Sequence, residues 1–259
     1  MTTEPRPLRP AMKRHLLLLC LFFTSTLTAT ELRIGSATVS ITPDRPVALA
    51  GQFGTRIAEK AETPLICAAV AIESLKDGKP VDQSILISCD LVGIHHSVLA
   101  QFRTRLKALL PEIDGRKVIV SATHTHTAPV TSELPEETLI TYPIPKEGVM
   151  QPSEYTAFLI ERLSQAAIEA WNSRQPGGVS WTLGYAMVGE NRRSIYADGH
   201  AQMYGKTNDL RFRHLEAGSD SGVETLFFWD AGKQLKAIAI NLACPSQEVE
   251  SRTQCRLLA

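Results

Sequence analysis

Three short apolar runs constrain the fold most, because each predicts a buried β-strand. Continuous apolar runs of this length, bounded by turn signals, are typical of strands covered on both faces. The first run is followed by Asp77-Gly78, a turn signal. The runs themselves are Leu65–Ser74, Ser84–Cys89 and Lys117–Ala122.

Two amphipathic helices are expected to pack on these strands. In the first, apolar residues from Val98 to Leu109 recur at three- and four-residue spacing, and Pro111 ends the pattern. Ser153 can cap the second, and Gly177-Gly178 marks its end. Four more strands are expected at Arg33–Ile41, Val179–Val188, Glu224–Trp229 and Leu235–Leu242, the last two forming a hairpin across Asp230–Gln234 with Gly232 in the turn.

This order of elements predicts an α/β fold: a mixed β-sheet flanked by helices, in a single domain with a long His-bearing loop. The loop is Thr127–Pro152, which carries five prolines and no strong period. Loops of that size usually serve function or move. A second irregular, polar stretch covers Gly189–Ser221.

The composition excludes some functions. Lys and Arg number 27, and so do Asp and Glu, which argues against non-specific attraction to nucleic acid. Residues 1–30 have the order of a secretory signal peptide: basic Met12–His15, apolar Leu16–Phe23, then small residues. We therefore expect a secreted or periplasmic protein without a transmembrane span after signal removal. An N-terminal membrane anchor is the alternative.

The sharpest chemical feature is the pair His124 and His126, which follows a buried strand directly. On an extended chain, residues i and i+2 point to the same face. Two imidazoles so placed can share a metal ion, or one can bind metal while the other moves protons. The alternative is two polar histidines satisfied on a loop.

Three further positions carry candidate chemistry, each with a plainer alternative. Asp90 ends a strand and can orient a histidine or approach a metal, or it can simply form a turn. Asn191-Arg192 can bind a carboxylate or phosphate, or lie in a solvated basic turn. Cys244 follows a strand and can be a zinc ligand or nucleophile, or a buried thiol. We expect the strands before Asp90, His124 and Cys244 to end on one side of the sheet.

Together these motifs resemble the N-terminal catalytic domain of the neutral, non-lysosomal ceramidase family. Thr123–Pro129 closely matches that family's Thr-His-Thr-His signature. On this resemblance residues 31–251 form a ceramidase-like domain and residues 252–259 an unmatched tail. The other segments that carry it are Ile34–Ala37, Ile41–Pro43, Gly51, Leu65–Ile72, Ser88–Leu91, Asn191-Arg192 and Asn241–Ser246.

The resemblance implies a zinc-dependent amide hydrolase that splits N-acylsphingosine into a fatty acid and sphingosine. It makes His124 a zinc ligand and His126 a catalytic residue that stabilises the oxyanion or moves protons. Arg192 would be catalytic, Asn191 would bind the lipid-like amide substrate, and Asp90 would lie behind the zinc ligands. The chemistry agrees, because zinc polarises a carbonyl and cationic side chains stabilise developing negative charge.

Two departures from the family pattern bear on function. Cys244 stands where the family has its second zinc histidine, and cysteine also binds zinc. The family's Gly-Asp-x-Ser-Pro stretch and its later Glu and Tyr ligands have no match after Ser251, so we expect a truncated or frameshifted chain. The alternatives are a metal-dependent hydrolase of another ester or amide, and a secreted, non-catalytic binding domain.

Overall fold

A computed structural model describes residues 30–131, 142–247 and 256–257 of the 259-residue chain. Of the expected signal peptide, residues 1–30, all but the last residue lie outside the described residues. So do part of the proline-rich loop, residues 132–141, and most of the unmatched tail. Those expectations therefore stay predictions.

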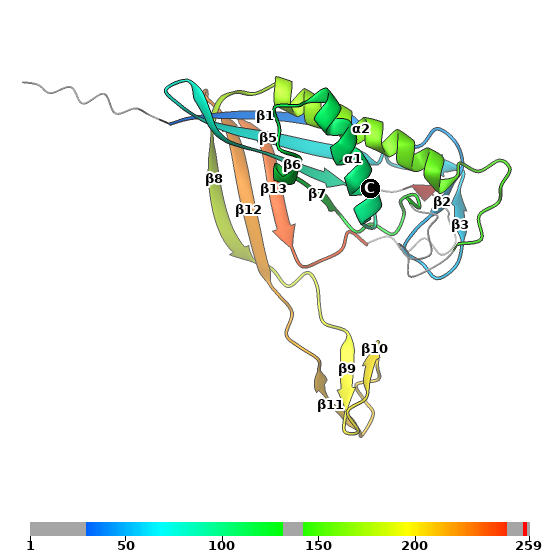
Figure 1. Ribbon diagram of the computed structural model, residues 1–259. Coiled ribbons are helices and arrows are strands. Elements are labelled where there is room, and N and C mark those ends of the chain that lie inside the picture. Colours follow the sequence, from blue (N-terminus) through cyan, green and yellow to red (C-terminus); the bar gives the residue numbers. More distant parts are fainter. Residues whose placement is uncertain (1–29, 132–141, 248–255, 258–259) are drawn as a thin grey trace, which may run out of the picture.

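The centre of the fold is a seven-stranded sheet in the order β13-β12-β8-β1-β5-β6-β7 (Figure 1). Neighbouring strands are antiparallel except β6 and β7, which are parallel. The mixed sheet of the α/β prediction is thus confirmed. The bounds are β1 Glu31–Ser40, β5 Ile66–Lys76, β6 Lys79–Cys89, β7 Val118–Ala122, β8 Gln175–Tyr185, β12 Gly222–Asp230 and β13 Leu235–Leu242.

Two helices, α1 (His96–Leu109) and α2 (Pro152–Asn172), lie on the same side of β1, β5 and β6 (Figure 1). The predicted cap of α2 was wrong by two residues. The cap is Gln151, whose side chain and that of Glu154 form a reciprocal capping box, with Pro152 at the first helical position. A short 3₁₀ turn, η1 (Gly115–Lys117), leads into β7.

The core lies between the helices and one face of the sheet, as strand alternation requires. Along β5 every second residue from Cys67 to Leu75 is buried. Gly35 of β1 allows α2 to approach closely, because a Cβ there would press on the Ala170 carbonyl. The helices do not cover the whole sheet: Trp181 and Tyr185 on β8 are 79% and 75% exposed.

The predicted end of α2 was also wrong, whereas Gly232 lies in the β12–β13 turn as predicted. Gly177 lies inside β8, where a Cβ would collide with the Trp229 carbonyl of β12, so it permits strand contact instead of ending a helix. In the β12–β13 turn the Lys233 amide donates to the Asp230 carbonyl at 3.0 Å, and Lys233 has a left-handed backbone with φ 62°.

The stretch predicted to be irregular contains a three-stranded sheet, β10-β9-β11, which stands off from the ends of β8 and β12 (Figure 1). Its strands are too short to give a clear alternating pattern. Two further pairs of short strands complete the described part of the fold. The remaining bounds are β2 Val47–Leu49, β3 Arg56–Ala58, β4 Lys60–Ala61, β9 Arg193–Tyr196, β10 Ala201–Met203, β11 Phe212–Leu215 and β14 Arg256–Leu257.

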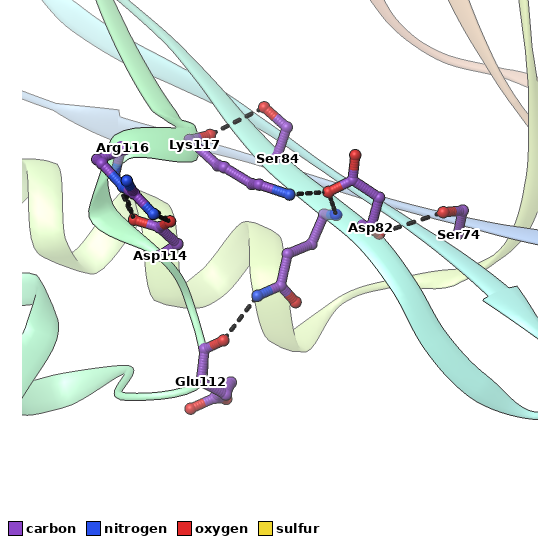
Figure 2. A network of polar contacts seen from close by, with 8 residues as sticks. Ser74, Asp82, Ser84, Glu112, Asp114, Arg116 and Lys117 are labelled. Carbon is purple, nitrogen blue, oxygen red and sulfur yellow. Dashed lines mark hydrogen bonds and ion pairs between the residues drawn. The ribbon is translucent and has the colours of Figure 1, made fainter.

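A polar network ties η1 and the start of β7 to the β5–β6 hairpin (Figure 2). The Lys117 ammonium contacts the Asp82 carboxylate, and Ser84 Oγ donates to the Lys117 carbonyl at 2.9 Å. Gln83 Nε2 donates to the Glu112 carbonyl at 2.6 Å. These contacts join the segment before β7 to the hairpin that contains β6. Within the described residues, neither helix is long and apolar enough to cross a membrane.

Candidate functional site

Three segments meet at one edge of the sheet, where β6 and β7 end. The two strands are parallel neighbours, so Cys89 and Ala122 lie side by side. Just beyond them the Thr123 amide donates to the Cys89 carbonyl at 2.9 Å. The Ser246 amide, which follows β13, donates to the Thr123 carbonyl at 2.9 Å. The segments that follow the three strands therefore meet as expected, although β13 lies at the far edge of the sheet and runs in the opposite sense to β6 and β7.

Asp90 is buried beneath this edge and holds two strands together. Its Oδ2 accepts from the Ile66 amide at 2.8 Å, and its Oδ1 accepts from Thr123 Oγ1 at 3.3 Å. Burial raises the pKa of the Asp90 carboxyl, while these two hydrogen bonds oppose the shift. Asp90 therefore positions Thr123, the residue immediately before His124.

His124 and His126 come together, although not on an extended chain as predicted. β7 ends at Ala122, and His124 has a left-handed backbone with φ 61°. The two Nε2 atoms lie 3.2 Å apart, and the rings meet edge to face with their centroids 4.9 Å apart. The juxtaposition comes from this turn and not from strand alternation.

The protonation of the His124 ring follows from its partner. Its Nδ1 lies 2.6 Å from the Val92 carbonyl oxygen, which can only accept, so Nδ1 carries the proton. In neutral His124 the Nε2 atom therefore carries a lone pair, which faces His126 Nε2 and can accept its proton or bind a metal. The Val92 carbonyl thus selects the tautomer that a metal site requires.

His126 sits in a tight cradle that sequence reasoning did not find. Gly51, with φ 94°, lies against its ring, and a Cβ at that position would collide with the ring carbons. The Gly51 amide donates to Tyr142 Oη at 2.9 Å. Arg56 Nη2 donates to the Ala50 and His126 carbonyls at 2.7 and 2.5 Å. No local sequence signal marks Arg56 or Tyr142, because their contacts are to distant backbone atoms.

The surroundings of His126 favour its neutral form. Burial, then the neighbouring charges of His124 and Arg56, lower its pKa. Its Nδ1 is buried and has no hydrogen-bond partner among the described residues. A neutral imidazole at ordinary pH is suited to accept a proton from a reacting group.

The histidine pair supplies part of a zinc site. Two nitrogens on one tetrahedral zinc, each at about 2.0–2.1 Å, lie about 3.3–3.4 Å apart, close to the 3.2 Å between the Nε2 atoms. Among residues 30–131, 142–247 and 256–257, however, no three His, Cys, Asp or Glu side chains are grouped to hold an ion. The described residues offer two nitrogen ligands and not a complete site.

Cys244 reaches this edge but does not join the histidines in such a group. Its thiol is directed to the Val188 and Pro245 carbonyls, at 3.4 and 3.5 Å. Its loop packs on Gly189, where a Cβ would lie 3.6 Å from the Cys244 Cβ. Its role as a ligand stays a prediction.

Asn191 and Arg192 are engaged at the base of the β10-β9-β11 sheet. The Asn191 amide donates to Ser219 Oγ at 2.8 Å, and its side chain donates to the Ala217 carbonyl at 3.1 Å. The Arg192 guanidinium lies over the Tyr204 ring, 4.8 Å from its centroid. The hydrogen bonds and ion pairs seen in the described part of the chain do not link either residue to the histidines.

Two replacements of Asp90 test the effects of its charge and of its hydrogen bonds on stability separately. The raised pKa means that the folded state binds the Asp90 proton more tightly than the unfolded state. The protonated carboxyl therefore contributes its full stability below pH 3.8, and this contribution is lost as the pH rises through the pKa of the folded state. Asp90→Asn keeps an acceptor without the buried charge, and we expect its free energy of unfolding at pH 7 to match or exceed wild type. Asp90→Ala should lose about 1–2 kcal/mol.

Urea unfolding of both variants across pH 3–7 measures this. The difference between wild type and Asp90→Asn should shrink toward acid pH. An Asp90→Asn variant as unstable as Asp90→Ala at pH 7 would contradict this account.

Comparison with known proteins supports the fold. No protein-family model matches the sequence, and no curated protein matches it. The solved neutral ceramidase from Pseudomonas aeruginosa superposes with a TM-score of 0.61 at 19% identity, covering 82% of this chain and 31% of that chain. A ceramidase complexed with C2 gives a TM-score of 0.59 at 20% identity, with the same coverage of 82% and 31%. The chain therefore has a ceramidase-like fold and spans 31% of the length of each of these structures.

Proposed function

We propose that this chain forms part of a ceramidase-like amide hydrolase, with zinc as its metal and a lipid-like amide as its substrate. The observation that carries the proposal is the His124–His126 pair, with Nε2 atoms 3.2 Å apart and the His124 tautomer set by the Val92 carbonyl. The ceramidase-like fold of the solved structures supports the same reaction class.

Within this proposal each histidine has its own task. His124 presents its Nε2 lone pair as the zinc ligand. When bound, zinc supplies Lewis-acid polarisation of the amide carbonyl. His126, kept neutral chiefly by burial, moves a proton at Nε2 beside the reacting amide. Arg56 holds the His126 backbone through its carbonyl and so keeps the ring in place.

A non-catalytic binding domain is the second candidate, and a specific observation favours it. Asn191 and Arg192, which the resemblance assigns to the substrate, are occupied by Ser219, Ala217 and Tyr204. A chain whose described residues offer an incomplete set of zinc ligands, and hold Asn191 and Arg192 elsewhere, can bind a lipid amide without cleaving it.

Zinc titration and hydrolysis together test the proposal. We expect purified protein to bind zinc, measured by competition with a chromogenic indicator, and His124→Ala to lower the affinity at least about tenfold. His200→Ala is the matched control, because His200 stacks on Tyr196 in the small sheet, away from the pair. Hydrolysis of a fluorescent N-acylsphingosine is measured beside each titration, and we expect it to be slow because the described residues do not complete a zinc site.

The outcomes distinguish the candidates. Zinc-dependent hydrolysis that falls in both His124→Ala and His126→Ala supports the hydrolase. Lipid-amide binding without hydrolysis at saturating zinc supports the binding domain. If wild type binds no more zinc than His124→Ala, the metal assignment is wrong.

A further inference from the structure

Two buried cysteines lie opposite each other on neighbouring strands, and one of them, Cys89, directly precedes Asp90. Cys67 of β5 and Cys89 of β6 are directly opposite in the antiparallel register. Both are free thiols with 0% exposed surface. Neither has a part in the proposed amide hydrolysis.

The hydrogen-bond pattern shows which kind of strand pair they form. The Asp90 amide donates to the Ile66 carbonyl at 3.0 Å, so Ile66 and Asp90 are the hydrogen-bonded pair. Pairs alternate along an antiparallel ladder, so the next pair, Cys67 and Cys89, is not hydrogen-bonded. Opposed Cα atoms in such pairs are about 4.5 Å apart, within the roughly 4.4–6.8 Å that disulfides span.

We propose that Cys67 and Cys89 close a disulfide across β5 and β6 when the chain folds in the presence of a small-molecule disulfide oxidant. One thiolate attacks the oxidant and forms a mixed disulfide, and the second thiolate then displaces it. The two S–H bonds are lost and one S–S bond forms. The two electrons reduce the oxidant's disulfide, which leaves as two thiols carrying the two protons.

The burial of the pair sets when this bond forms. In the folded, reduced protein a hydrogen bond with Cys67 and burial raise the pKa of Cys89, so little reactive thiolate exists. Closure therefore belongs to folding, before α2 covers the sulfurs. Once closed, the bond is shielded from reductants by the same core.

The position of the bond gives it a structural consequence at the site. The Cys89 carbonyl accepts from the Thr123 amide, and Asp90 follows directly. A link from Cys89 to Cys67 would hold the ends of β5 and β6 together beneath His124. It would also close the hairpin through Asp77-Gly78, which limits the freedom of the unfolded chain.

Refolding the full chain with glutathione disulfide, or with a reductant in its place, tests the proposal. After proteolysis without reductant, mass spectrometry should find the Cys67 and Cys89 peptides linked and lighter by two hydrogen atoms. The oxidised protein should melt roughly 6–12 °C above the reduced protein. Cys244→Ser, the matched control, should keep both the link and the shift.

A Cys67→Ala variant should lose the difference in melting temperature between the two conditions. If it does not fold, the wild-type comparison still decides. The proposal is overturned if Cys67 and Cys89 of oxidant-refolded protein are both alkylated as free thiols after denaturation. It is equally overturned if either is linked to another cysteine of the chain.

Discussion

Replacing Gly51 by alanine is expected to destabilise the protein by about 2–5 kcal/mol and to displace His126. Gly51 has φ 94°, a conformation that costs an L-residue about 1–2 kcal/mol. A Cβ there also collides with the His126 ring, and overpacking of this kind costs about 1–3 kcal/mol more. The free energy of unfolding from urea melts measures the loss, and the histidine imidazole NMR signals report the ring.

Gly78→Ala is the matched control for this prediction. Gly78 also has a positive φ, 74°, but an added Cβ would meet nothing within 4 Å. It should cost only the backbone strain, about 1–2 kcal/mol, and leave the His126 signals unchanged. Equal losses in the two variants would show that the contact with His126 carries no energy.

The parts of the fold that the sequence predicts are those with a strong local pattern. β5, β7 and the second half of β6 are continuous apolar runs, and α1 has a clear helical period, so these segments were predicted to within a few residues. The polar first half of β6, residues 79–83, was missed. The β10-β9-β11 sheet was missed because its strands have three or four residues, too few for alternation to show. Gly177 was misread because its reason, the nearby Trp229 carbonyl, lies far along the chain.

The same distinction applies to the site. His124 and His126 are visible in the sequence, and the meeting of the segments that follow the strands was predicted correctly. The way they meet was not, because it depends on a left-handed His124. The roles of Val92 and Arg56 could not be predicted from the sequence. Val92 acts through its backbone carbonyl, which every residue type has, and Arg56 lies 70 positions from His126.

The other large effect is expected at Tyr155, which joins α2 to the strand ends beneath the site. Its side chain is fully buried, and its hydroxyl donates to the Ile41 carbonyl at 2.9 Å. The Ile41 amide in turn donates to the Leu65 carbonyl, just before Ile66 contacts Asp90. Tyr155→Ala should therefore lower the free energy of unfolding by about 3–5 kcal/mol, through the cavity left by the ring.

Tyr155→Phe separates the ring from the hydroxyl. It keeps the packing and leaves the buried Ile41 carbonyl without its donor, a loss of about 1–2 kcal/mol. Leu210→Ala, at a side chain 98% exposed, should change stability by no more than about 0.5 kcal/mol. In thermal and urea unfolding, Tyr155→Ala should be the least stable of the three variants, Tyr155→Phe intermediate and Leu210→Ala the most stable. If Tyr155→Phe loses as much free energy of unfolding as Tyr155→Ala, the hydroxyl and not the ring holds α2 in place. The strand ends around Asp90 would then depend on that one hydrogen bond.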